Sequence, residues 1–166
     1  MTAEKEFQQL YYRMAQLCEE NNWGDPFSYA RAKEILAASV LGHKVASTYA
    51  GADAFLPDGT PVEYKSTIGG KNKGSYTGIS VQPTWEQQEK YLKEEKIAKY
   101  PEHYFNRFDK EKGFLVEVWK LKGEDVYNIL LPKLKEKFAT VLNKKDPRLS
   151  ANVTNTEIKN YGTRVI

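Results

Sequence analysis

Three residues have the types and spacing needed for phosphodiester chemistry: Asp53, Glu63 and Lys65. Glu63 and Lys65 are two positions apart, so on a β-strand their side chains share a face. Carboxylate oxygens are the ligands that Mg²⁺ prefers, and a lysine beside the ion stabilises the negative charge of a phosphate under attack. The backbone carbonyl of Tyr64 supplies a third oxygen. These residues predict a hydrolytic site that uses Mg²⁺, for which Mn²⁺ can substitute.

The segment 44–67 must position these residues, and it predicts two short strands joined by a tight turn. Pro57-Asp58-Gly59 is typical of a type I turn closed by a glycine bulge. Leu56 then pairs with Thr60, which places Asp53 across from Glu63. Two facing carboxylates repel each other, and one lysine does not neutralise both, so the pattern favours a cation between them.

Other copies of the same pattern carry less information. Glu-x-Lys also occurs at Glu94–Lys96 and Glu157–Lys159, in a chain that is 28% charged. Only the copy at Glu63 follows a strand with an acid and a turn of suitable length. The literal Pro57-Asp58 pair lies at the tip of the hairpin, where it serves the turn. Asp53 is therefore the predicted ligand.

With these residues the chain resembles the PD-(D/E)XK nuclease superfamily, and in particular the PvuII-type restriction endonucleases. Similar segments follow in the same order: 22–42, the 44–67 hairpin, 73–83 and the closing Gly162-Thr163-Arg164, with an apparent insertion at 86–108 whose role the sequence does not show. The resemblance implies an α/β (α+β), restriction-endonuclease-like fold. We therefore expect a central mixed β-sheet flanked by helices in a single domain, 1–166. The chain departs from the family at Ala50, where those enzymes have an acid.

The resemblance also implies a function. It is that of a Mg²⁺-dependent type II site-specific deoxyribonuclease, a homodimer that cleaves double-stranded DNA at a short palindromic site and is paired functionally with a DNA methyltransferase. One alternative is a structure-specific or repair nuclease of the same superfamily, such as a junction resolvase. Another is a catalytically silent DNA-binding protein, against which the intact set of Asp53, Glu63 and Lys65 argues.

The glycine- and lysine-rich stretch 68–78 is either a flexible loop or a DNA contact. Its place directly after the catalytic strand favours DNA, with lysines to phosphates and the other polar side chains toward the groove or backbone. The predicted contacts here are Lys71, Lys73, Ser75, Tyr76, Thr77, Ser80 and Gln82. The family reads bases with histidines in this register, whereas this chain has Gly78, Ile79 and Ser80.

A second candidate for base reading lies at 148–155, a stretch of short polar side chains that equally suits surface turns. The resemblance places a base-reading asparagine near Ser150. Asn152 is two residues away, and asparagine pairs well with adenine. Both residues are predicted DNA contacts.

Composition limits the other possibilities. The chain has 166 residues, 40% of them hydrophobic, with a net charge of +3 that is compatible with a polyanionic partner. No apolar run approaches the roughly 20 residues of a membrane span, and no signal peptide is evident, so no membrane partner is expected. The single Cys18 fits a reducing, cytoplasmic location.

Periodicity predicts the remaining elements. A helix over about 3–21 carries an apolar stripe from Phe7 to Cys18, which either packs on the core or, by the resemblance, forms the dimer interface. A second helix begins at Asp25-Pro26 and ends at Gly42. The rest is predicted as a polar helix over 84–99, an irregular stretch over 100–108, strands over 114–120 and 126–131, and a helix opening at Pro132.

Overall fold

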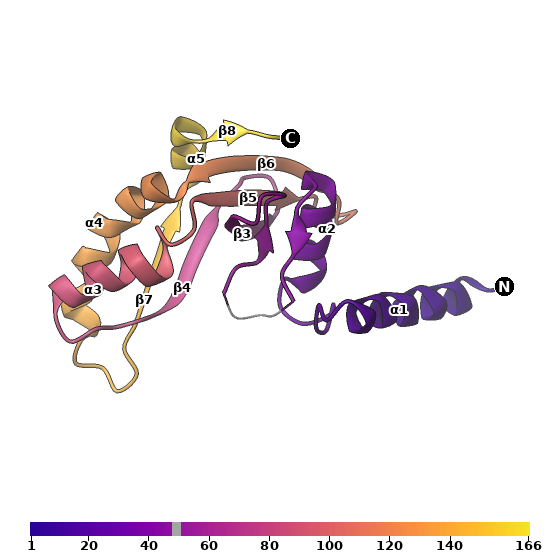
Figure 1. Cartoon of the computed structure of the whole chain (residues 1–166), viewed down its shortest axis with the longest axis horizontal. Helices are drawn as coiled ribbons and strands as arrows, with labels where there is room; N and C mark the ends of the chain where they lie inside the picture. The colour runs from indigo at the N-terminus through magenta and orange to yellow at the C-terminus, as the bar shows by residue number, and fades with distance from the viewer. Residues whose placement is uncertain (48–50) are drawn as a thin grey trace. The chain divides into compact units, whose positions relative to one another are not determined.

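The computed structural model describes residues 1–47 and 51–166, so Ala50 lies outside the described residues. The chain divides into two compact units, Met1–Thr60 and Pro61–Ile166, each with its own elements (Figure 1). The single domain expected for 1–166 stays a prediction. Within the part of the chain that the structure describes, no helix is long and apolar enough to span a bilayer.

The first unit contains two helices and a short ribbon: α1 (Ala3–Glu20), α2 (Arg31–Leu41), β1 (Lys44–Val45) and β2 (Ala54–Phe55). The predicted N-terminal helix is confirmed, as is the end of the second helix at Gly42, whose φ of +70° suits glycine. The predicted start at Asp25 is wrong. Tyr29 has φ of +52°, which no helix allows, and the Asp25 carboxylate instead accepts the backbone N–H of Phe27 at 2.9 Å.

The second unit is a mixed sheet with helices, in agreement with the predicted α/β class. Strand β3 pairs in parallel with β5, β5 pairs antiparallel with β6, and β6 pairs antiparallel with β8. A separate antiparallel ribbon joins β4 to β7. The elements are β3 (Pro61–Ile68), β4 (Gly74–Ser80), α3 (Trp85–Tyr91), the π-helix η1 (Leu92–Lys96), β5 (Glu102–Phe108), β6 (Leu115–Lys122), α4 (Gly123–Val141), β7 (Arg148–Val153), α5 (Asn155–Tyr161) and β8 (Thr163–Arg164).

The core of this unit lies between the sheet, the β4–β7 ribbon and α4, which runs along β7 (Figure 1). Phe105 and Leu121 from the sheet meet Leu130 and Leu134 from α4, and all four are almost fully buried. Burial of such side chains contributes about 1.5–3 kcal/mol each. This packing fixes the strands that carry the candidate site.

Several predictions for this unit are wrong, because local pattern did not reveal tertiary pairing. Residues 126–131 form helix α4 instead of a strand, and Pro132 lies inside that helix. Helix α4 begins at Gly123, where a Cβ atom would lie 1.9 Å from the carbonyl oxygen of Tyr100. The irregular stretch 100–108 contains the central strand β5. Residues 148–153, for which the sequence left both surface turns and DNA contacts open, form strand β7. The polar helix over 84–99 is confirmed as α3 and η1, and the strand over 114–120 as β6.

Candidate functional site

The turn before β3 has the predicted form. The Leu56 N–H donates to the Thr60 carbonyl and the Gly59 N–H to the Leu56 carbonyl, both at 2.9 Å. Gly59 has φ of +89°, as a glycine bulge requires. The Thr60 N–H donates to the Asp58 carboxylate at 2.9 Å, and this bond lowers the pKa of Asp58. Asp58 therefore serves the turn, as predicted.

Asp53 lies in the first unit, directly before β2. Its carbonyl accepts the N–H of Ala46 at 3.1 Å, which extends the pairing of β1 with β2. Glu63 and Lys65 lie in the second unit, on β3. The predicted position of Asp53 across from Glu63 stays a prediction.

Glu63 and Lys65 share one face of β3, as strand alternation predicts. Val62 and Tyr64 point to the other face and are buried. The Lys65 ammonium forms an ion pair with Oε1 of Glu63, and both side chains remain about one-fifth exposed, at 20% and 18%. A carboxylate and an amine are thus held together where a substrate can reach them.

Two buried residues lie next to this ion pair, His103 beside Glu63 and Tyr76 beside Lys65. His103 stands beside Glu63 in the β3–β5 register and is fully buried. Its Nδ1 lies 2.8 Å from the Tyr76 hydroxyl and its Nε2 lies 2.9 Å from the Ile97 carbonyl. Because that carbonyl only accepts, Nε2 carries the hydrogen and Nδ1 accepts from the tyrosine. Burial lowers the pKa of His103 to about 4, so the ring is neutral at pH 7.

Sequence reasoning missed His103 and gave Tyr76 another role. Tyr76 was expected to contact DNA, but only 6% of it is exposed and its hydroxyl bonds His103, so it faces the interior in this structure. The ring of Tyr76 lies 4.8 Å from Nζ of Lys65. The one available signal was the alternation of glycine, serine, tyrosine and threonine over 74–77, which is typical of a strand with an inward tyrosine.

The β4–β7 ribbon brings together predicted DNA contacts that are far apart in the sequence. Ser75 pairs with Asn152 and Ser80 pairs with Arg148, whose Nη1 donates to the Ser80 hydroxyl at 3.1 Å. The inward residues of both strands are buried, so the outer face is polar. That face contains Ser75, Thr77, Arg148, Ser150 and Asn152, all of them exposed.

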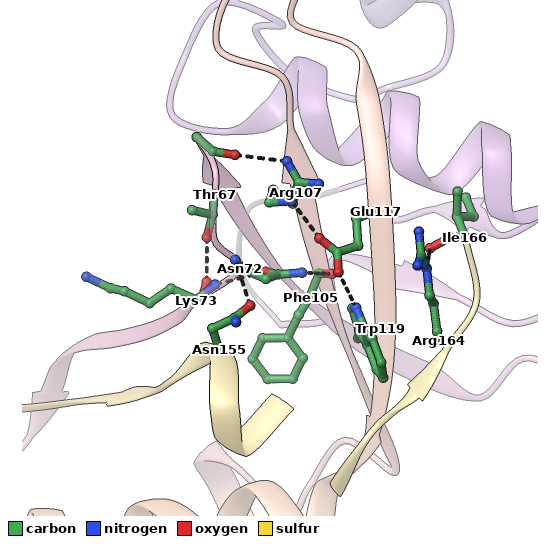
Figure 2. A network of polar contacts seen from close by, with 11 residues as sticks. Thr67, Asn72, Lys73, Phe105, Arg107, Glu117, Trp119, Asn155, Arg164 and Ile166 are labelled. Carbon is green, nitrogen blue, oxygen red and sulfur yellow. Dashed lines mark hydrogen bonds and ion pairs between the residues drawn. The ribbon is translucent and has the colours of Figure 1, made fainter. Parts of the chain in front are cut away.

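The loop between β3 and β4 is anchored at both ends by polar contacts (Figure 2). The Thr67 hydroxyl donates to the Lys73 carbonyl at 2.5 Å, and Arg107 donates to the Gly69 carbonyl at 3.0 Å. The buried amide of Asn72 donates to the carbonyl of Phe105 at 2.9 Å. Lys71 and Lys73 are exposed on this anchored loop, and their contact with DNA phosphates stays a prediction.

Gln82 follows the ribbon, and its backbone N–H donates to the Gln88 side chain at 2.7 Å. The segment is therefore tied to α3, while the Gln82 side chain stays partly exposed.

The predicted Mg²⁺ would be held by hard oxygen donors. Glu63 suits Mg²⁺ because its carboxylate is partly exposed and only one of its oxygens is in the ion pair. Among the described residues, no group of three or more His, Cys, Asp or Glu gathers in one place. Mg²⁺ needs only one or two carboxylates and completes its shell with water, so Glu63 fits such a site.

Comparison with models of known protein families gives no match for this chain, and comparison with curated proteins gives none either.

Proposed function

We propose that the chain is a Mg²⁺-dependent, sequence-specific endonuclease of the type II restriction kind, with a restriction-endonuclease-like fold. The observation that carries this proposal is the Glu63–Lys65 pair: a partly exposed carboxylate and amine on one face of β3, after the turn that the nuclease signature requires. Asp53, Glu63 and the Tyr64 carbonyl are the proposed metal ligands. The bound metal supplies a more acidic water and charge neutralisation at phosphorus.

The roles of the side chains follow from their chemistry. The Glu63 carboxylate would hold the cation, which would supply positive charge for binding the scissile phosphate. The Lys65 ammonium donates hydrogen bonds to the phosphate and stabilises the charge that develops there. The exposed Lys71 and Lys73 bind flanking phosphates, and the outer face of the β4–β7 ribbon meets the groove.

The partners follow from the same proposal. Double-stranded DNA is the substrate, and a homodimer presents one site to each strand of a palindrome. Helix α1 is the proposed dimer contact, because Phe7, Leu10 and Tyr12 are 68%, 59% and 62% exposed. A DNA methyltransferase that protects the host sequence is the proposed functional companion.

The test is digestion of plasmid DNA with Mg²⁺, followed by sequencing of the fragment ends. We expect discrete bands that share one short palindrome. Lys65→Ala and Glu63→Ala should abolish the bands and leave the fold intact. The matched control is Glu94→Ala with Lys96→Ala, which removes the same residue types at the same spacing from an exposed π-helix. Cleavage of branched DNA alone would favour the structure-specific nuclease, and full activity of Lys65→Ala would contradict the assigned site.

A further inference from the structure

Within the described part of the chain, the Lys65 ammonium contacts two different groups. One is the Glu63 carboxylate, with which it forms an ion pair, and the other is the ring of Tyr76, whose centroid is 4.8 Å away. A cation at this distance from the face of an aromatic ring is attracted by the electrons of that face. The two contacts hold the amine from different strands, because Glu63 lies on β3 and Tyr76 on β4.

The Tyr76 ring is itself fixed by buried hydrogen bonds. Its hydroxyl donates to Nδ1 of His103 on β5, and Nε2 of His103 donates to the carbonyl of Ile97 at the end of η1. Tyr76 is 6% exposed and His103 is 0% exposed, so water cannot replace these partners without opening the core. The chain of contacts from Ile97 to Lys65 therefore joins four segments of the second unit: the end of η1, β5, β4 and β3.

We propose that Tyr76, held by His103, is a positioning residue that keeps the Lys65 ammonium in place for catalysis. The statement about catalysis rests on the proposed function, whereas the statement about placement does not. When a cation occupies the oxygens of Glu63, the carboxylate attracts Lys65 less strongly. The Tyr76 ring does not bind the cation. Its attraction for the Lys65 ammonium therefore stays the same when Glu63 binds a cation.

Three variants separate the ring from its hydroxyl. Tyr76→Leu removes the ring and should lower kcat roughly tenfold, with KM for DNA unchanged because the buried ring does not contact the substrate. Tyr76→Phe keeps the ring but loses the bond to His103, and His103→Phe removes the acceptor from the other side. Both should lower kcat about two- to threefold. Partial rescue by Tyr76→Phe relative to Tyr76→Leu is the signature of positioning by the ring.

The matched control is Tyr104→Phe. Tyr104 is also buried, at 4% exposed, and its hydroxyl donates to Glu102 at 2.7 Å. This variant removes a buried tyrosine hydroxyl on the neighbouring strand β5, without touching the Tyr76–His103 pair. Its kcat should equal that of the parent chain, and thermal melts of all variants show whether each one is folded.

A second measurement does not depend on activity. In NMR spectra of protein labelled with ¹³C in lysine side chains, the methylene next to the Lys65 amine should be shifted upfield by the Tyr76 ring. The signal is assigned by its loss in Lys65→Met. The upfield shift should persist in Tyr76→Phe and Tyr104→Phe and disappear in Tyr76→Leu.

The outcomes distinguish the two proposals. Loss of the upfield shift in Tyr76→Leu supports the placement even if the parent chain cleaves no DNA, a result that would count against the proposed function alone. An unchanged Lys65 signal in folded Tyr76→Leu overturns the placement. Active parent protein with an unchanged kcat in Tyr76→Leu overturns the positioning role. If Tyr76→Leu does not fold, the comparison of Tyr76→Phe and His103→Phe with Tyr104→Phe decides: equal kcat in all three overturns the role.

Discussion

Two ion pairs lie on the same face of the sheet in the second unit, and they differ in how many hydrogen-bond partners their charged groups have. Arg107 donates to Glu117 at 2.6 Å and to the Gly69 carbonyl at 3.0 Å, while the second oxygen of Glu117 accepts from Trp119 at 2.6 Å (Figure 2). In the pair of Lys65 with Glu63, the second contact of the amine is instead the uncharged ring of Tyr76. Among the described residues, both oxygens of Glu117 have partners, so this saturated pair stabilises the fold. The pair of Glu63 with Lys65 is unsaturated within the same residues and partly exposed, so it has capacity left for a ligand.

The electrostatics agree with this difference. Burial opposes ionisation of Glu117, but the hydrogen bonds from Arg107 and Trp119 outweigh it and hold the pKa of Glu117 below its usual value. The pair is therefore charged and satisfied at neutral pH. Because Arg107 also donates to the Gly69 carbonyl, the Arg107–Glu117 pair stabilises the loop 69–73.

The largest effect, on DNA cleavage, is expected when the unsaturated pair of Glu63 with Lys65 is broken. Glu63→Gln keeps the shape but removes the charge that a cation needs, so DNA cleavage should fall at least about 10³-fold. The unfolding free energy should change by less than about 1 kcal/mol, because the ion pair is partly exposed. Plasmid cleavage and denaturant melts measure the two effects. A large loss of stability with retained cleavage would reverse the assignment of the two pairs.

The second prediction breaks the saturated pair. Arg107→Met leaves the Glu117 carboxylate, 11% exposed, without its cation and the Gly69 carbonyl without its donor. The unfolding free energy should fall by about 2–3 kcal/mol. Urea melts compare Arg107→Met with Lys65→Met, which should lower the unfolding free energy by less than about 1 kcal/mol. Equal costs for the two variants would show that the pairs do not differ.

The third prediction concerns pH and sharpens the picture of the site. His103 has a pKa of about 4 in the folded protein against 6.5 unfolded. The unfolded chain therefore binds more protons between these values, and stability is lost as pH falls from about 6.5 toward 4. The full shift corresponds to about 3 kcal/mol. Urea melts at pH 7, 5.5 and 4.5 should show a steeper loss for the parent chain than for His103→Gln. Parallel curves would mean that His103 is not held neutral.

The smallest expected effect concerns the loop that the saturated pair anchors. Lys71→Ala and Lys73→Ala should each lower the slope of log affinity against log salt concentration by about 0.9, with little change in stability. DNA binding in Ca²⁺, without cleavage, measures the slope. Lys96→Ala, an exposed lysine on η1, is the control and should leave the slope unchanged. An unchanged slope in both loop variants would remove this loop from the DNA interface.

Local sequence determined the features that depend on neighbouring residues. Pro57-Asp58-Gly59 specified its turn because proline, a short acid and glycine each suit one backbone conformation. Strand alternation alone placed Glu63 and Lys65 on one face. The apolar stripe of α1 and its end near Asn21 were equally evident.

Tertiary structure decided what depends on partners far away in the sequence. Residues 126–131 are apolar enough for a strand or a helix, and packing against β7 and the sheet selects the helix. The pairing of Ser75 with Asn152 and the bond of Tyr76 to His103 join segments separated by 77 and 27 positions. No local pattern encodes such pairings, because their energy comes from burial and hydrogen bonding that exist only when the strands meet.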